Sequence, residues 1–308
     1  MAAVTEVDMS VDKKTTHTNA PLVVVAGPTA SGKSAVAMQI ARDFGGEIIC
    51  ADSRTIYTGM DTGTAKPTAE DRAEIPHWGL DLVNPGEPFS AADFKEYTLA
   101  KVAEIRSRGA VPLLVGGTGL YIDGVIFDYQ FSAPNPELRA QLNAYTLGEL
   151  KEYCKNNNIP LPENENNRRY VQRAAEQGVV NTLRRKTPLE NTIIVGITTE
   201  SSELRERMTL RAQEMFEGGV VEEGLSLAEK YGWDSEAMTG NVYPLIRQYK
   251  EGILSEAELK EKFITSDWRL AKRQRTWLKR NPFIQWKQRS EAYDFIAAQL
   301  VSAGCSKK

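Results

Sequence analysis

A short segment near the N-terminus constrains the fold of this chain more than any other feature. It matches the phosphate-binding loop (P-loop) pattern at every fixed position, and its residues are Gly27, Pro28, Thr29, Ala30, Ser31, Gly32, Lys33 and Ser34. A β-branched apolar run, Leu22–Ala26, precedes the loop, and apolar residues at helical spacing follow it over Ser34–Phe44. A strand, a glycine-rich loop and a helix in this order are the context that a P-loop requires.

The residue types in this loop suit it to bind a phosphate or a diphosphate. Glycines let backbone N–H groups converge on anionic oxygens, and the N-terminus of the following helix adds the positive end of its dipole. Lys33 supplies a mobile positive charge, and the Ser34 hydroxyl is placed to bind Mg²⁺. We therefore favour an anion-binding site over a structural turn, although the motif specifies the bound group and not the reaction.

Further strand and helix signals alternate along the first half of the chain. Apolar runs predict strands at Glu47–Asp52, Gly79–Val83 and Val111–Val115. Ser90 and Asp93 have the spacing of a capping box and predict a helix that runs to about Arg108. This alternation predicts a parallel sheet with helices on both of its faces.

Strand signals disappear over residues 132–188, where the pattern predicts three helices: Asn135–Tyr145, Leu147–Asn156 and Asn167–Gln177. A strand signal returns at Thr192–Ile197, and further helices are predicted at Ser202–Phe216, Val220–Tyr231 and Ser255–Leu278. The expected fold class is α/β: a P-loop parallel sheet with a mainly helical insertion domain. We expect a disordered leader at 1–20, a discontinuous P-loop domain at 21–131 and 189–308, and the insertion at 132–188.

Composition narrows the class of protein. The chain has 308 residues and a formal net charge of −3, so a polyanionic partner needs a local basic patch. Three widely separated cysteines favour a reducing compartment, and the two histidines have no zinc-site spacing. No apolar run is long enough to span a membrane, and the first twenty residues lack the apolar stretch of a signal peptide. We expect a cytoplasmic protein.

Residues alone leave the reaction open. Most P-loop proteins cleave or transfer a phosphoryl group, so a nucleotide or small-molecule kinase is a natural alternative. Such proteins usually carry an acid at the end of the strand beside the P-loop, whereas Val111–Val115 ends in Gly116-Gly117-Thr118. Asp52, which ends another apolar run, can take that acidic role.

A basic segment near the C-terminus offers a surface for RNA. Residues 268–280 contain six Lys or Arg side chains interleaved with Trp268 and Trp277. Cations that bind phosphates beside aromatic rings that stack on bases are a common way to hold RNA. A solvated helix face is the simpler interpretation of the same charges.

Taken together, several segments resemble the successive motifs of bacterial tRNA dimethylallyltransferases. They are Gly27–Ser34, Asp52–Tyr57, Gly59–Pro67, Pro76-His77, Ser90–Phe94, Gly116–Tyr121 and Arg269–Trp277. The resemblance covers roughly residues 22–286 and implies transfer of a dimethylallyl group from dimethylallyl diphosphate, with Mg²⁺. The acceptor would be the exocyclic amine of the adenosine 3′ of the anticodon in tRNA, and the product isopentenyladenosine.

The resemblance also implies roles for individual residues. Lys33 and Ser34 would hold the diphosphate leaving group and its metal, in place of a nucleotide triphosphate. Asp52 matches a carboxylate that hydrogen-bonds the adenine amine and acts as its general base. Thr118 matches a hydroxyl close to both substrates, and Arg211 matches an arginine aimed at the diphosphate.

A larger set would contact the anticodon stem-loop of tRNA. Besides Asp52 and Thr118, it comprises Ser53, Arg54, Thr55, Arg139, Arg168, Arg169, Arg173, Tyr243, Arg269, Lys272, Arg273, Gln274 and Arg275. The segment 239–245 departs from the family pattern, and only Tyr243 aligns comfortably there. Tyr170 stands where the family commonly has a second arginine. We expect a monomer.

Two further interpretations lie outside this reaction. An isopentenyltransferase acting on free adenine nucleotides would show binding that is insensitive to salt, whereas tRNA binding weakens steeply with salt. An RNA-binding module with a degenerate P-loop would show no turnover.

Overall fold

The computed structural model describes residues 19–131, 135–178 and 184–308. Residues 1–18 of the predicted disordered leader lie outside this range, so that prediction is not tested there. The same holds for residues 132–134 and 179–183 of the predicted insertion. Within the described part of the chain, no helix combines the length and the apolar character needed to cross a membrane.

The described residues form a six-stranded sheet in the order β3-β2-β4-β1-β5-β6, and every strand pair in it is parallel. The strands are β1 (Leu22–Ala26), β2 (Gly46–Ala51), β3 (His77–Trp78), β4 (Val111–Gly116), β5 (Thr192–Thr198) and β6 (Gln285–Gln288). The central strands β1 and β4 are buried along their whole length. The prediction of an α/β fold with a parallel sheet is confirmed.

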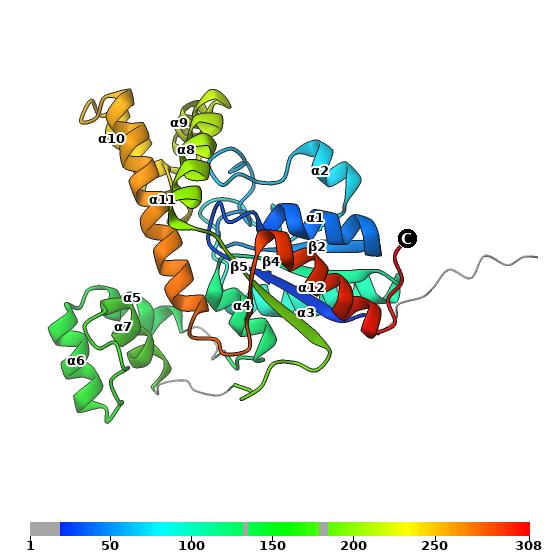
Figure 1. The fold of residues 1–308 in the computed structure, drawn as a ribbon. Helices are drawn as coiled ribbons and strands as arrows, with labels where there is room; N and C mark the ends of the chain where they lie inside the picture. Colours follow the sequence, from blue (N-terminus) through cyan, green and yellow to red (C-terminus); the bar gives the residue numbers. More distant parts are fainter. Residues whose placement is uncertain (1–18, 132–134, 179–183) are drawn as a thin grey trace, which may run out of the picture. The chain divides into compact units, whose positions relative to one another are not determined.

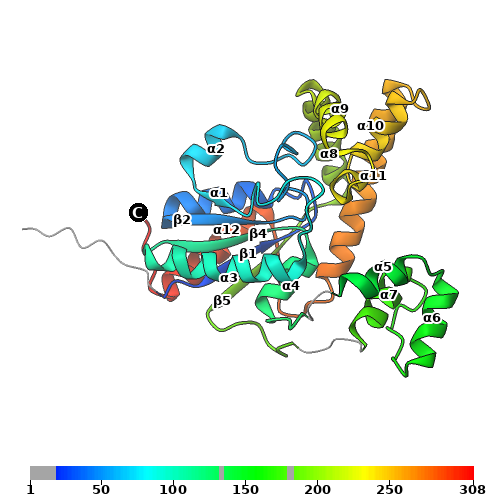
Figure 2. The same ribbon diagram turned by 180° about the vertical axis from the view of Figure 1, so that it is seen from behind.

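Helices cover both faces of this sheet. α1 (Lys33–Phe44) and α12 (Arg289–Ser302) pack against each other and against the strands on one face. α3 (Ala91–Ser107) and α4 (Gly119–Ile126) follow on the other side, and Phe94 of α3 stacks on Tyr121 of α4. α12 lies in front of the sheet in Figure 1, and α3 lies in front of it in Figure 2.

The strand register brings three loops to one edge of the sheet. Ala26, the last residue of β1, pairs with Gly116 of β4, and Gly116 pairs with Ala51 of β2. The residues that follow these strand ends are those of the P-loop, of the Gly-Gly-Thr loop and of the segment that begins at Asp52. Parallel α/β sheets bind their ligands at this carboxyl edge.

A second group of helices carries its own apolar core. It consists of α8 (Ser201–Glu217), α9 (Val220–Tyr231), a 3₁₀ turn η1 (Glu236–Thr239), α10 (Tyr243–Lys250) and α11 (Glu256–Leu278). Tyr243 and Phe263 are among its largest buried side chains, and Met60 joins them from the loop before α2 (Ala69–Glu74). The neighbouring helices α8 and α11 supply the side chains that reach the P-loop.

Residues Asp123–Leu189 form a compact unit separate from the rest of the chain. Its helices are α5 (Pro136–Asn143), α6 (Leu147–Asn156) and α7 (Arg168–Gln177), close to the three predicted ranges. They enclose a small core that includes Leu142, Leu150 and Val171. The unit begins at Asp123, within α4, and so earlier in the chain than the predicted start of the insertion at residue 132.

One predicted strand is wrong. Residues 79–83 do not form a strand, and the third strand is instead the two-residue β3, which pairs with Ile48 and Ile49. Gly79 and Asp81 both have positive φ, of 78° and 53°, so the backbone turns there. Sequence analysis also missed β6 and α2, α4, α10 and α12, which are short or lack a clear apolar period.

Candidate active site

The P-loop wraps the N-terminus of α1. Gly32 is the residue before that helix and has a left-handed φ of 86°, which a side chain would strain. Gly27 is equally restricted, since a Cβ there would lie 2.7 Å from Ser31 Oγ. Ser31 Oγ is buried and has no hydrogen-bond partner among the described residues. A glycine-rich loop at the N-terminus of a helix is suited to bind an anion through backbone N–H groups.

Two side chains from distant helices fix this loop. Thr29 N–H donates to Gln274 Oε1 of α11 at 2.8 Å, and Arg211 Nη1 of α8 donates to Thr29 Oγ1. Gln274 also packs against the Gly-Gly-Thr loop, because a Cβ at Gly117 would lie 2.5 Å from Gln274 Nε2. Arg211 therefore lies beside the P-loop, as its predicted role requires. Gln274, predicted to contact tRNA, supports the P-loop backbone in this structure.

Lys33 is the cation inside the loop. Its Nζ donates to Pro28 O at 3.2 Å. Burial lowers the pKa of Lys33 to about 8; the nearby Asp52 and Asp267 oppose the shift, and Arg211 adds to it. Burial disfavours the charged form, so a bound anion would restore what the lysine loses in solvation.

This pKa predicts how anion binding depends on pH. Only protonated Lys33 attracts a diphosphate, and the folded pKa lies near 8. The affinity for inorganic pyrophosphate should therefore fall as the pH rises through about 8, by up to about tenfold per pH unit. Isothermal titration calorimetry between about pH 6.5 and 9.5 measures this.

Lys33→Arg is the matched control for this pH prediction. Arginine keeps its charge over the whole range, so this variant should show only the titration of pyrophosphate itself. Parallel pH profiles of the wild type and Lys33→Arg would refute the assignment.

Asp52 and Thr118 come together from neighbouring strand ends. Thr118 Oγ1 accepts a hydrogen bond from Ser53 N–H at 3.1 Å, and Thr118 N–H donates to Ala51 O. Asp52 Oδ1 accepts from Arg54 N–H at 2.8 Å, and Oδ2 receives no hydrogen bond from the described residues. One carboxylate oxygen is thus anchored while the other remains available as a proton acceptor.

Asp267 is a site residue that sequence analysis missed. Its side chain lies in α11 and is 6% exposed, and its Oδ2 is 3.5 Å from Arg211 Nη1. Burial raises the pKa of Asp267, while Arg211 and Lys33 oppose that shift. A signal was present in the sequence, since Asp267 falls at helical spacing between Phe263 and Ala271 on the buried face of α11.

Close packing joins α11 to the Gly-Gly-Thr loop. A Cβ at Gly119 would overlap the indole ring of Trp277. Gly119→Ala should therefore displace Trp277 and lower the free energy of unfolding by about 1–3 kcal/mol, measured by denaturant unfolding. The control is Gly148→Ala in α6, where the nearest atom is Thr146 Oγ1 at 3.9 Å. A control that loses as much stability as Gly119→Ala would contradict this account.

The cations of α11 predicted to contact tRNA lie on its surface. Arg269, Lys272, Arg273 and Arg275 are all exposed. Lys272 Nζ lies 5.3 Å from the centroid of the Trp268 ring, and Arg205 of α8 lies 4.7 Å from the same centroid. A basic surface with an aromatic ring is suited to RNA.

Three of the predicted tRNA contacts have structural partners in the P-loop unit. Tyr243 is completely buried, and its hydroxyl donates to Glu223 Oε1 at 2.8 Å. No atom of its side chain is exposed in this structure, and its contact with tRNA stays a prediction. Thr55 is also buried. The side chain of Arg54 is engaged within the protein, because its Nη1 donates to Glu236 O at 2.8 Å. Ser53 remains partly exposed beside Asp52.

In the insertion the predicted arginines differ from one another. The guanidinium of Arg168 donates to the carbonyls of Leu142, Asn143 and Tyr145 and closes the end of α5. Arg139 forms an ion pair with Glu176 at 2.9 Å. Arg169 and Arg173 are exposed. The exposed pair is therefore better placed for a phosphate than Arg168.

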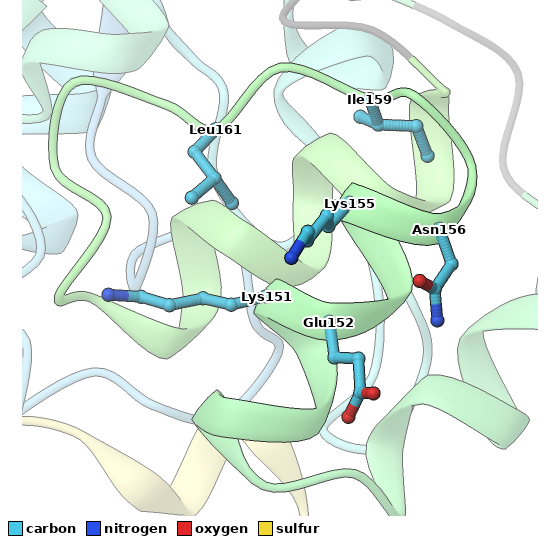
Figure 3. A pocket seen from close by; sticks show the side chains of 6 residues that line it. All are labelled: Lys151, Glu152, Lys155, Asn156, Ile159 and Leu161. Atoms are coloured by element: carbon cyan, nitrogen blue, oxygen red, sulfur yellow. The ribbon is translucent and has the colours of Figure 1, made fainter.

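A surface pocket of about 550 Å³ also lies in the insertion, along α6 (Figure 3). Lys151, Glu152, Lys155, Asn156, Ile159 and Leu161 line it. None of the predicted catalytic residues is among them.

The donor set of the P-loop fits a Mg²⁺ ion that is held mainly by a diphosphate. Ser34 follows Lys33 and is exposed at the start of α1. In the described part of the chain, no group of three or more His, Cys, Asp or Glu side chains could enclose a metal. Mg²⁺ needs few protein ligands where phosphate oxygens and water complete its shell.

Comparison with known proteins gives consistent matches. Residues 55–281 match the family model described as IPP transferase. A tRNA dimethylallyltransferase of Roseiflexus sp. (strain RS-1) is 36% identical, over 86% of this chain and 92% of its own. One from Anoxybacillus flavithermus is 37% identical, over 86% and 89%. The crystal structure of a tRNA isopentenylpyrophosphate transferase from Bacillus halodurans matches with a TM-score of 0.71 and 31% identity, covering 92% of this chain and 98% of that one.

Proposed function

Because the chain belongs to the IPP transferase family, we propose that it is a prenyltransferase that modifies tRNA. The donor is dimethylallyl diphosphate, and the acceptor is the exocyclic amine of the adenosine 3′ of the anticodon. The observation that supports this most is the meeting, at one sheet edge, of an anion-binding loop, the Asp52 carboxylate and the Thr118 hydroxyl.

The reaction is a displacement at the primary allylic carbon. A C–N bond forms to the adenine amine, the C–O bond to the diphosphate breaks, and the amine loses one proton. Asp52 accepts that proton through Oδ2, the carboxylate oxygen that receives no hydrogen bond within the described part of the chain. A base is needed because an amine conjugated to a purine ring is a weak nucleophile. Lys33, Arg211 and the backbone N–H groups of the P-loop stabilise the negative charge of the departing diphosphate.

A Mg²⁺ ion belongs to this proposal as a partner of the diphosphate. Ser34 is the protein ligand we assign to it, and the ion would neutralise charge on the leaving group. Lys33 and Arg211 lie at the same loop and would bind the diphosphate together with the ion.

The tRNA is held by exposed cations on two parts of the chain. Arg269, Lys272, Arg273 and Arg275 offer phosphate contacts from α11, and Arg169 and Arg173 offer them from the insertion. The target base leaves its stack to reach the reacting carbon, as in other enzymes that modify bases.

All three cysteines are free thiols, which agrees with a protein that works in the reducing cytoplasm. We propose that the protein acts as a monomer.

Incubation of the protein with radiolabelled dimethylallyl diphosphate and unmodified tRNA, without ATP, tests this function. Label should reach the RNA, and the digested product should contain isopentenyladenosine. Transfer that requires ATP, or a phosphorylated product, would support a kinase instead. Label on free adenine nucleotides but not on tRNA, with binding that salt does not weaken, would indicate the related nucleotide-modifying activity.

A further inference from the structure

Two arginines that the site description has not used lie against the P-loop at Gly32. A Cβ built on Gly32 would lie 2.9 Å from Cδ of Arg289 and 3.0 Å from Nη1 of Arg207. Arg289 is the first residue of α12, and Arg207 lies in α8, four residues before Arg211. Two distant segments of the chain therefore bring guanidinium groups to the same glycine.

Positive charge gathers at this glycine, and Glu203, Asp267 and Asp52 offset part of it. Gly32 immediately precedes α1, so both arginines approach the positive end of the helix dipole. Lys33 and Arg211 add two more positive charges around the same loop, and the charge of Arg211 contributes to the lowered pKa of Lys33. Like charges at such a place are stabilised when a polyanion lies between them.

The two arginines differ in their contacts with the rest of the protein. Arg207 forms an ion pair with Glu203 at 2.5 Å, one turn earlier on α8, and its side chain is 24% exposed. Arg289 is exposed, and no ion pair of Arg289 forms within the described residues. Arg289 is thus free to turn toward a ligand, whereas Arg207 is already oriented.

We propose that Arg207 and Arg289 bind the outer phosphate of the diphosphate, the one farther from the prenyl carbon, while Lys33 and Arg211 bind within the loop. This assignment rests on the proposed function for the identity of the anion. Arg289 lies beyond residues 55–281, which the family model matches, so the family match does not assign it. The pair would control the affinity for the donor and the release of pyrophosphate.

The test measures binding of inorganic pyrophosphate, with Mg²⁺, to Arg207→Ala, Arg289→Ala and Arg289→Lys. Loss of a hydrogen bond between charged groups weakens binding on the order of tenfold, so each alanine variant should show that loss. Arg289→Lys should recover part of it, because the charge remains. In transfer assays KM for dimethylallyl diphosphate should rise by a similar factor, with a smaller change in kcat.

Arg42→Ala is the matched control, since Arg42 lies near the other end of α1 and pairs with Glu74. It should bind pyrophosphate as the wild type does. A dissociation constant within about twofold of the wild type for either alanine variant would overturn the role of that arginine. Pyrophosphate binding needs neither tRNA nor turnover. If the wild type fails to modify tRNA, the proposed function is rejected. The pyrophosphate affinities of the variants can still be interpreted in that case.

Discussion

Lys33→Ala is expected to reduce kcat/KM for prenyl transfer on the order of 10²–10³-fold, while the affinity for tRNA changes little. The lysine is the cation enclosed by the P-loop, with its Nζ 3.2 Å from Pro28 O. Its removal takes away charge that stabilises the leaving group as the C–O bond breaks. Steady-state kinetics with saturating tRNA, together with a filter-binding assay for tRNA, separates the two quantities.

The control for this variant is Lys250→Ala, an exposed lysine at the end of α10 that should leave both quantities unchanged. The role assigned to Lys33 fails if Lys33→Ala loses tRNA affinity and transfer in equal measure. Such a result would mean that the loop supports the RNA-binding surface and not the diphosphate.

Asp52→Asn is expected to lower kcat on the order of 10²–10⁴-fold with little change in stability. Asparagine keeps the shape of the side chain and can still accept the 2.8 Å hydrogen bond from Arg54 N–H. It cannot take a proton from the adenine amine. Single-turnover rates with bound tRNA measure the chemical step directly.

Asp234→Asn is the matched control, because the Asp234 side chain is 95% exposed. It should react at the wild-type rate. If Asp52→Asn also reacts at a nearly normal rate, Asp52 is not the base, and its carboxylate then serves the segment 52–55 structurally.

The parts of the site that follow from sequence are those encoded by local patterns. The P-loop lies between β1 and α1, as its motif predicts, and Asp52 and Thr118 follow strands that apolar runs revealed. Because parallel strands end at a common edge, local patterns were enough to bring these residues together.

The residues that sequence reasoning missed act through long-range packing. Asp267 belongs to the site because α11 buries it beside Arg211. It was overlooked in the sequence because the basic residues that follow dominate this segment. Arg289 reaches Gly32 because β6 pairs with β5 and α12 begins directly after β6, and neither element has a strong sequence pattern. Similarly, Gln274 lies in a basic segment that looks like an RNA surface, yet its amide oxygen accepts from Thr29 N–H. A residue's neighbours across the fold decide such roles.

The insertion shows the same limit. Its three helices were predicted from their sequence pattern, and the structure adds a capping box of Thr146 and Glu149 at the start of α6. Which of its arginines face solvent could not be predicted in this way, because Arg168 and Arg169 are adjacent in sequence and only Arg168 binds the carbonyls of α5.

The central claim is that the P-loop holds a diphosphate while carbon, and not phosphorus, is transferred. Dimethylallyl diphosphate labelled with ¹⁸O at the oxygen between carbon and phosphorus tests it most directly, with the released pyrophosphate and the modified tRNA analysed by mass spectrometry. The account predicts that all of the label leaves in pyrophosphate and that the RNA gains an unlabelled prenyl group. Label retained in a prenyl alcohol, together with a phosphorylated product, would show cleavage at phosphorus and contradict it.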